Sequence, residues 1–250
     1  VFLDFFVPVF KQLELTGAVR YDSISRIKDA VNQVTVGQTM SAATYKMSAR
    51  FQVSPQVLIR ASYGTGFKAP SMLDIAEPEV PRGVTAAPYD CPFPGTDACK
   101  PGKAQYSVLS SGNSLLKPEK SKQGTIGIRF EPTADFGIGA DYWQVKIRDA
   151  VSAVSADQAF ANPQKYSTLF KTYRTPAETQ DYWAFLSAST NIGRAINSGI
   201  DWDVVARFNT QIGRLTTGLA GTYVIDSSYT RPGTDNDFTD SLNKYGENAA

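Results

Sequence analysis

The stretch YKMSARFQVSPQVLIRASY, residues 45–63, decides the fold. Apolar and polar side chains alternate on both sides of Ser54-Pro55, and the apolar positions are Tyr45, Met47, Ala49, Phe51 and Val53, then Val57, Ile59, Ala61 and Tyr63. Successive side chains of a strand point to opposite faces, so this period of two predicts strands with one apolar and one polar face. Because Ser-Pro is typical of a turn, the stretch predicts a β-hairpin.

The same alternation recurs in three further pairs of segments. They are residues 1–10 with 13–21, 122–130 with 136–147, and 198–208 with 215–225. Within each pair the intervening turn is about two to five residues long, which is typical of hairpins. The sequence therefore predicts an all-β chain with about eight antiparallel strands in four hairpins.

The connections between hairpins are much longer than the turns inside them. They cover roughly residues 28–40, 68–117 and 151–187, and a polar segment follows at 231–250. Outer-membrane barrels alternate short periplasmic turns with long extracellular loops, and their strands are about ten residues long. We therefore predict the wall of a transmembrane β-barrel with membrane lipid against its apolar face and extracellular loops at these four places.

Aromatic side chains lie near both ends of the predicted strands. Those close to the short turns are Phe51, Phe130, Phe136 and Phe208, and those toward the long connections are Tyr21, Tyr63, Phe67 and Tyr223. Two such bands are typical of the aromatic girdles at membrane interfaces. Trp202 falls in the middle of a strand and does not fit either band.

The composition excludes several classes of protein. Lys plus Arg number 25 against 24 Asp plus Glu, so the chain lacks the cationic excess of a nucleic-acid binder. It has no histidine, which excludes Ser-His-Asp catalysis and His-ligated zinc built from this chain alone. No apolar run is long enough for a membrane-spanning helix.

Four segments, in order, resemble motifs of the TonB-dependent receptors, the energised transporters of the outer membrane. They are Arg60–Ser71 (RASYGTGFKAPS), Leu116–Ser121 (LKPEKS), Ala140–Trp143 with the alternating residues up to Val151, and Asn191–Ala195 (NIGRA) continuing to Asp201. We interpret these motifs as structural: Gly64 and Gly66 relieve crowding where a strand leaves the sheet.

The resemblance implies a barrel of about 22 strands with a plugged lumen, so the 250 residues would be a fragment of one barrel domain. We expect the plug, the segment that engages the energising TonB protein, and the final strand to be missing from it. The implied function is import of a scarce nutrient, above all a ferric siderophore, across the outer membrane of a Gram-negative bacterium. The implied protein is not an enzyme and has no cofactor.

Three other classes of protein are alternatives. A passive porin has the same strand pattern, and only the motifs speak against it. A soluble β-sandwich binding module would pack its apolar rows against each other. An outer-membrane hydrolase built on a barrel is disfavoured by the absence of histidine.

Three sets of residues are candidate sites. Aromatic residues of the long loops could capture a partly apolar ligand or pack the loops together: Tyr89, Phe93, Tyr106, Tyr166, Tyr173 and Trp183. Arginines on the polar face could contact the plug or line a solvated lumen: Arg50, Arg60, Arg129 and Arg207. In an oxidising compartment, Cys91 and Cys99 are expected to form a disulfide, with free thiols or a metal site as alternatives.

We predict no metal site, since Asp235, Asn236, Asp237 and Asp240 lack the calcium-loop pattern.

Overall fold

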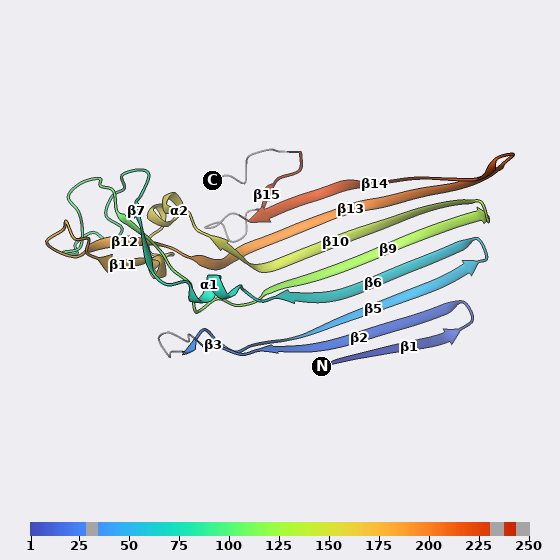
Figure 1. Cartoon of the computed structure of the whole chain (residues 1–250), viewed down its shortest axis with the longest axis horizontal. Helices are drawn as coiled ribbons and strands as arrows, with labels where there is room; N and C mark the ends of the chain where they lie inside the picture. Colours follow the sequence, from blue (N-terminus) through green and yellow to red (C-terminus); the bar gives the residue numbers. More distant parts are fainter. Residues whose placement is uncertain (29–34, 231–237, 244–250) are drawn as a thin grey trace.

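The structure, a computed structural model, describes residues 1–28, 35–230 and 238–243. Its main element is one antiparallel sheet in the order β1-β2-β5-β6-β9-β10-β13-β14-β15 (Figure 1). The strands are β1 (Phe2–Phe10), β2 (Leu13–Ile24), β5 (Met40–Ser54), β6 (Val57–Lys68), β9 (Glu119–Thr133), β10 (Phe136–Ala153), β13 (Ser189–Thr210), β14 (Gly213–Thr230) and β15 (Phe238–Asp240).

The eight predicted strands and their four hairpins are confirmed, and β15 adds a ninth strand to the sheet. Several strands are longer than the alternation indicated. β13 has 22 residues and begins at Ser189, whereas the pattern indicated a start at Ser198. At about 3.4 Å per residue, β13 is roughly 70 Å long, far more than the hydrocarbon layer requires. Outside that layer neither face has to be apolar, so the alternation ends before the strand does.

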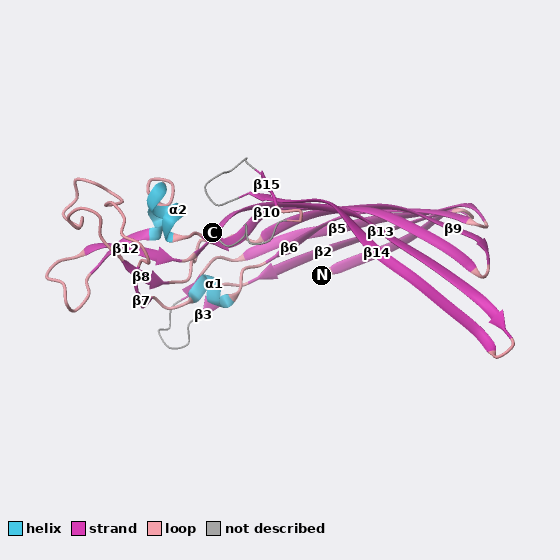
Figure 2. Ribbon diagram, turned by 90° about the horizontal axis from the view of Figure 1, so that it is seen from above, coloured by secondary structure: helices cyan, strands magenta, loops and turns pink. Residues whose placement is uncertain are grey.

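The sheet places all four tight turns at one end and the long connections at the other (Figures 1 and 2). The first long connection contains the short pair β3 (Ile27–Lys28) and β4 (Thr35–Val36). Of the predicted loop at 231–250, only residues 238–243 are described. Asp235, Asn236 and Asp237 lie outside the described residues.

The connections at 68–117 and 151–187 fold together into a loop subdomain. The first contributes α1 (Met72–Ala76), β7 (Val80–Val84) and β8 (Ser107–Ser110); the second contributes α2 (Ala156–Ala161), the 3₁₀ turn η1 (Ser167–Leu169), β11 (Phe170–Tyr173) and β12 (Tyr182–Ser187). They form a four-stranded sheet in the order β11-β12-β8-β7, in which β12 and β8 run parallel. This pairing joins segments about 75 residues apart, which local alternation does not show.

Helix α2 is bounded by local signals in the sequence. Ser155 caps its N-terminus and forms a reciprocal capping box with Gln158, and the helix ends before Pro163. Within the described ranges, none of the helices has the length and apolar character needed to cross a membrane.

The two faces of the main sheet differ in chemistry. One carries exposed apolar side chains such as Ile126 (57%), Ile128 (49%) and Leu219 (65%), and the other carries polar and charged ones. In a sandwich a second sheet would cover the apolar rows, but no second sheet pairs with or covers them in the described part of the chain. The apolar face is therefore the lipid-facing surface of a barrel wall.

Trp202, the aromatic residue outside both predicted bands, has a local role. It lies opposite Gly221 in the register of β13 and β14, and a Cβ on Gly221 would be 2.8 Å from the indole Cζ2. The ring covers the backbone that the glycine leaves bare, an arrangement that stabilises glycines in sheets.

An arginine in place of Ile128 should destabilise the intact protein in a bilayer by about 2–4 kcal/mol, because a cation near the middle of the apolar face must enter hydrocarbon. Lysine in place of Thr125, on the opposite face of the same strand, should have a much smaller effect. Denaturant titration of both variants in lipid bilayers measures the two free energies of unfolding. Equal losses would contradict the assignment of the faces.

Candidate functional site

Asn191 holds two of the loops where they leave the main sheet. Its Nδ2 donates to the backbone oxygens of Lys117 and Asp149, both at 2.8 Å, and its Oδ1 accepts from the Lys117 N–H at 2.7 Å. Asp149 lies in a β-bulge with a φ of 58°, in the left-handed region. The side chain of Asn191 thus replaces a strand partner at a point where the regular ladder is interrupted.

Helix α1 joins three segments at the same end of the sheet. Ser71 caps the helix and bonds to Asp74, and these hydrogen bonds, of which that from the Ser71 hydroxyl is the strongest, lower the pKa of Asp74. Asp74 also accepts from Ser189 Oγ at 3.3 Å, while its backbone oxygen accepts from the Asn113 N–H at 2.7 Å. Residues of the receptor-like motifs therefore act here as structural clamps.

The loop subdomain has a core of its own. Its buried residues are Val154, Ala159, Tyr166, Leu169, Phe170, Phe185 and Ala188, with Phe93, Val108, Ala156, Phe160 and Trp183 packed against them. A loop with such a core holds its shape without a ligand, because burial of apolar surface stabilises it.

The structure divides the six predicted loop aromatics into four groups. Tyr106 is fully buried and Tyr166 is 4% exposed, so their rings contact other loop residues. Phe93 and Trp183 pack together at 4.7 Å between ring centroids and are half-buried. Tyr173, at the end of β11, is partly exposed and stacks on no other ring among the described residues.

Tyr89, the sixth, is stacked on Phe160 with ring centroids 4.3 Å apart. Its hydroxyl donates to Asp157 Oδ1. This hydrogen bond is the main cause that raises the pKa of Tyr89 to about 12, with burial and the nearby carboxylate charge acting in the same direction. The phenol therefore stays neutral and links the connection at 68–117 to α2.

Cys91 and Cys99 are joined in a disulfide with their Cα atoms 5.4 Å apart. The short loop that they close is fastened to β12: Trp183 Nε1 donates to Thr96 Oγ1 at 2.9 Å, and the Trp183 N–H donates to Ala98 O at 3.0 Å. The disulfide stabilises the loop that carries Phe93 beside Trp183. Closing a loop of this size stabilises the folded state by roughly 2–3 kcal/mol, because it reduces the entropy of the unfolded chain.

The polar face of the main sheet carries ion pairs that each span three strands. Arg60 on β6 reaches across Gly127 on β9 to Asp141 on β10, with Nε 2.7 Å from Oδ1. Arg129 on β9 reaches across β10 in the same way, and its Nη1 is 2.8 Å from Asp203 Oδ2 on β13. Arg129 also bonds Glu131 on its own strand.

A glycine on the middle strand makes each of these pairs possible. A Cβ on Gly127 would overlap the Asp141 carboxylate and lie 2.6 Å from its Cγ. A Cβ on Gly139, the residue between Arg129 and Asp203 in the register, would lie 2.6 Å from Asp203 Oδ1. The aspartate carboxylates occupy the space over these glycines where they meet the arginines, because only a residue without Cβ leaves that space free.

The other two predicted arginines have weaker attachments. Arg50 lies 3.5 Å from Glu14 on the adjacent strand, and Arg207 Nη1 donates to Ala134 O in the β9–β10 turn at 2.8 Å. Both side chains remain exposed on the polar face. The structure thus brings Arg50 and Arg60 to one depression of about 640 Å³, which Asp141, Trp143 and Asp201 also line.

Sequence reasoning identified the arginines but missed the carboxylates that pair with them. Asp141 and Asp203 lie on the same face as Arg60 and Arg129, which the alternation shows, but their pairing depends on the register between strands. The signal available in the sequence was the glycine on the strand between the two partners, which lies opposite both of them. Within the described ranges, no cluster of three or more His, Cys, Asp or Glu side chains is placed to hold a metal ion.

Alanine in place of Gly127 should destabilise the intact protein by about 1–3 kcal/mol, because the new methyl group displaces Asp141 from Arg60. Gly218→Ala is the matched control on the same face, since its Cβ would meet only Val204 O at 3.8 Å. Denaturant titration in detergent compares the two. A Gly127→Ala variant as stable as the control would refute the packing role of the glycine.

Sequence and structure comparisons place the chain in a family. The family described as "TonB dependent receptor-like, beta-barrel" matches residues 1–248. No curated protein matches the chain.

Three similar solved structures share the fold. The siderophore receptor PirA from Acinetobacter baumannii has a TM-score of 0.61 at 14% identity, covering 90% of this chain and 27% of that one. A mutant of the ferric enterobactin receptor PfeA from Pseudomonas aeruginosa has 0.59 at 14%, covering 91% and 28%. The FrpB iron transporter from Neisseria meningitidis has 0.54 at 15%, covering 93% and 26%.

The chain thus spans about a quarter of the length of these structures. The likeness concerns the barrel wall: an antiparallel sheet with an apolar outer face, a polar inner face and folded loops at one end. This protein belongs to the TonB-dependent receptor-like β-barrel family of the Gram-negative outer membrane.

Proposed function

We propose that the intact protein is an energised outer-membrane receptor that binds a ferric siderophore and imports it with energy from the TonB system. The loop subdomain carries this proposal. It is a prefolded, aromatic-rich structure at the end of the wall opposite the tight turns, and we place that end outside the cell. A receptor that must capture a scarce ligand gains affinity when its binding loops are ordered in advance.

Similar structures support the choice of ligand. One is a siderophore receptor, a second is an iron transporter, and a ferric enterobactin receptor mutant with a TM-score of 0.58 is in complex with enterobactin. Aromatic side chains that are partly exposed on a stable scaffold suit a rigid, partly apolar chelate. Tyr173 and the pair Phe93 and Trp183 are the proposed contacts, whereas Tyr106 and Tyr166 form the core beneath them.

The proposed partners of the polar face follow from its ion pairs. Arg60 and Arg129 are neutralised by carboxylates of the wall itself. Arg50 and Arg207 are held less firmly and remain exposed, so we propose that they contact a plug in the lumen. TonB would act through that plug.

Iron uptake tests the function. Cells that express the intact protein as their only receptor should take up radiolabelled iron bound to the right member of a siderophore panel, and deletion of the TonB system should abolish that uptake. Uptake that persists without TonB would indicate a passive porin. Failure across the whole panel, with folded protein in the outer membrane, would refute siderophore import.

Two substitutions should separate binding from release. Tyr173→Ala should weaken binding of the transported siderophore by about 1–2 kcal/mol, because an aromatic contact is lost. Arg207→Gln should leave the binding affinity unchanged and slow uptake, because plug movement is disturbed. Fluorescence titration and uptake rates measure both quantities.

Tyr106→Ala serves as the control for loop stability. Its buried ring supports the core, so this variant should become sensitive to protease in the loops, whereas Tyr173→Ala should remain as resistant as the parent protein. An Arg207→Gln variant with altered affinity and normal uptake would overturn the assignment to the plug.

A further inference from the structure

Five cationic side chains gather on the apolar side of the main sheet, at the end where the long loops begin. The register places Lys120 opposite Arg148 and Lys122 opposite Lys146 on β9 and β10. Arg148 is in turn opposite Arg194 on β13. The result is one row of three cations across three adjacent strands and a second row of two.

These cations share a face with the lipid-facing residues. On β9, Lys120 and Lys122 precede Ile126 and Ile128 at even positions, and no bulge interrupts the register between them. Side chains two residues apart on a strand lie on the same side. The cations therefore lie at the outer edge of the apolar belt, on the exterior of the wall.

Among the described residues, none supplies a counter-charge to this cluster. All five side chains are exposed, and none forms an ion pair with any residue in the described ranges. Like charges directly opposite each other on neighbouring strands destabilise a sheet. Asp226 on β14 shares the face, but it lies opposite Ser198, one row closer to the belt.

Cations on the other face are arranged differently. There Arg60 and Arg129 each meet a carboxylate. The wall thus neutralises Arg60 and Arg129 internally, whereas the outer cluster meets no carboxylate in the described part of the chain and is open to an external anion.

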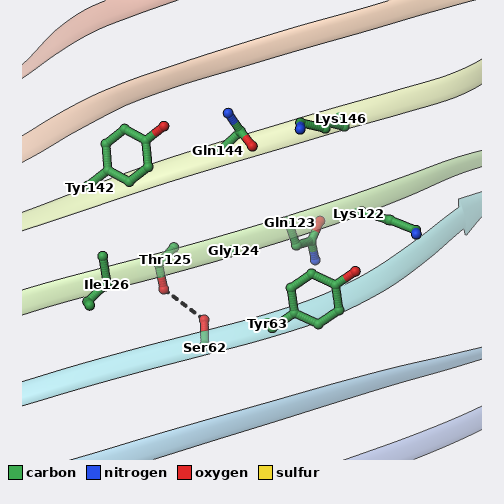
Figure 3. A pocket seen from close by; sticks show the side chains of 10 residues that line it. All are labelled: Ser62, Tyr63, Lys122, Gln123, Gly124, Thr125, Ile126, Tyr142, Gln144 and Lys146. Carbon is green, nitrogen blue, oxygen red and sulfur yellow. Dashed lines mark hydrogen bonds between the residues drawn. The ribbon is translucent and has the colours of Figure 1, made fainter.

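Two surface grooves meet at this cluster. One, of about 360 Å³, is lined by Tyr63, Lys122, Gly124, Tyr142 and Lys146 among others (Figure 3). The second, of about 310 Å³, is lined by Lys120, Lys122 and Arg148 together with residues of β5 and β6. Lys122 belongs to both.

The first groove runs from the cations onto the apolar belt. Tyr63 lies over Gly124, at 3.7 Å from the position a Cβ would take, so the glycine keeps the floor of the groove low. Tyr142 and Ile126 continue it toward the middle of the strands, and both are exposed. A ligand that fits has an anionic head at Lys122 and Lys146 and an apolar chain below.

We propose that Lys120, Lys122, Lys146, Arg148 and Arg194 bind the phosphate groups of an anionic lipid in the outer leaflet, whose acyl chains lie along the adjoining apolar belt. The charge complementarity, the groove and the position at the membrane interface all indicate a lipid of this chemistry. The proposal depends on the placement of the wall in the outer membrane and is independent of which nutrient is imported.

Native mass spectrometry of the intact receptor in detergent tests this lipid site, with dioleoyl phosphatidylglycerol as the anionic probe and dioleoyl phosphatidylcholine as the zwitterionic one. The anionic lipid should be retained preferentially. Lys122→Gln/Lys146→Gln should weaken its binding about tenfold, because each cation near an anionic headgroup contributes a several-fold change in affinity. Lys11→Gln/Lys46→Gln removes the same charge from a tight turn and from the polar face, and it should bind as the parent does.

Three outcomes would overturn the proposal: equal retention of the two lipids, equal loss in both double variants, or displacement of the anionic lipid by inorganic phosphate at equal concentration, which would indicate a site for the free ion. Lys122→Arg/Lys146→Arg keeps the charges and should preserve binding. If the glutamine variant fails to fold, the parent protein still tests the idea, since added salt should release the anionic lipid and leave the zwitterionic one unaffected.

Discussion

The structure depends on one constraint: a backbone that crosses hydrocarbon must satisfy all its hydrogen bonds within the protein. The antiparallel ladders from β1 to β14 do this with tight turns at one end, and five of these seven ladders hold neighbouring strands together over more than ten residue pairs. Once the register is set, the period of two assigns each side chain to lipid or to lumen. The chemistry of both faces of the wall follows from this assignment of side chains.

The inner face shows how a fixed register creates specific contacts. Arg60 and Asp141 are two strands apart, yet they form an ion pair because Gly127 leaves a gap between them. Arg129, Gly139 and Asp203 repeat the arrangement one strand further along. Each pair ties three strands together on a face that remains polar. The polar face can therefore carry these two arginines with little repulsion between them, because each is neutralised by a carboxylate.

The loop end of the wall solves a different problem. Long connections lose much conformational entropy when they become ordered, and they need burial to offset it. Here two connections share one core and one small sheet, and the Trp183 hydrogen bonds and the Asn191 clamp fasten them to each other and to the strands. The aromatics that the sequence marks as ligand candidates divide accordingly: Tyr106 and Tyr166 support the scaffold, and Tyr173 stays at its surface.

Part of this architecture could be predicted from the sequence and part could not, and β13 contains an example of each. Its apolar alternation from Ser198 onward identified the membrane-facing part, but its first nine residues escaped because their sequence does not alternate in this way. The pairing of β8 with β12 also escaped, since the contacts join residues about 75 positions apart. Helix α2 differs from both, because its capping box joins residues only three positions apart.

By itself, the sequence determined the fold class, the hairpin pairs, the two faces and the family, because these depend on local periodicity and on short motifs. Only the tertiary structure decided which carboxylate neutralises Arg60, which loop aromatics are buried, and that Lys122 and Lys146 lie opposite each other with no ion-pair partner among the described residues. Each of those facts depends on register and on contacts between distant segments. A one-residue shift of a strand would reverse every face assignment on it, so only the assembled sheet specifies them.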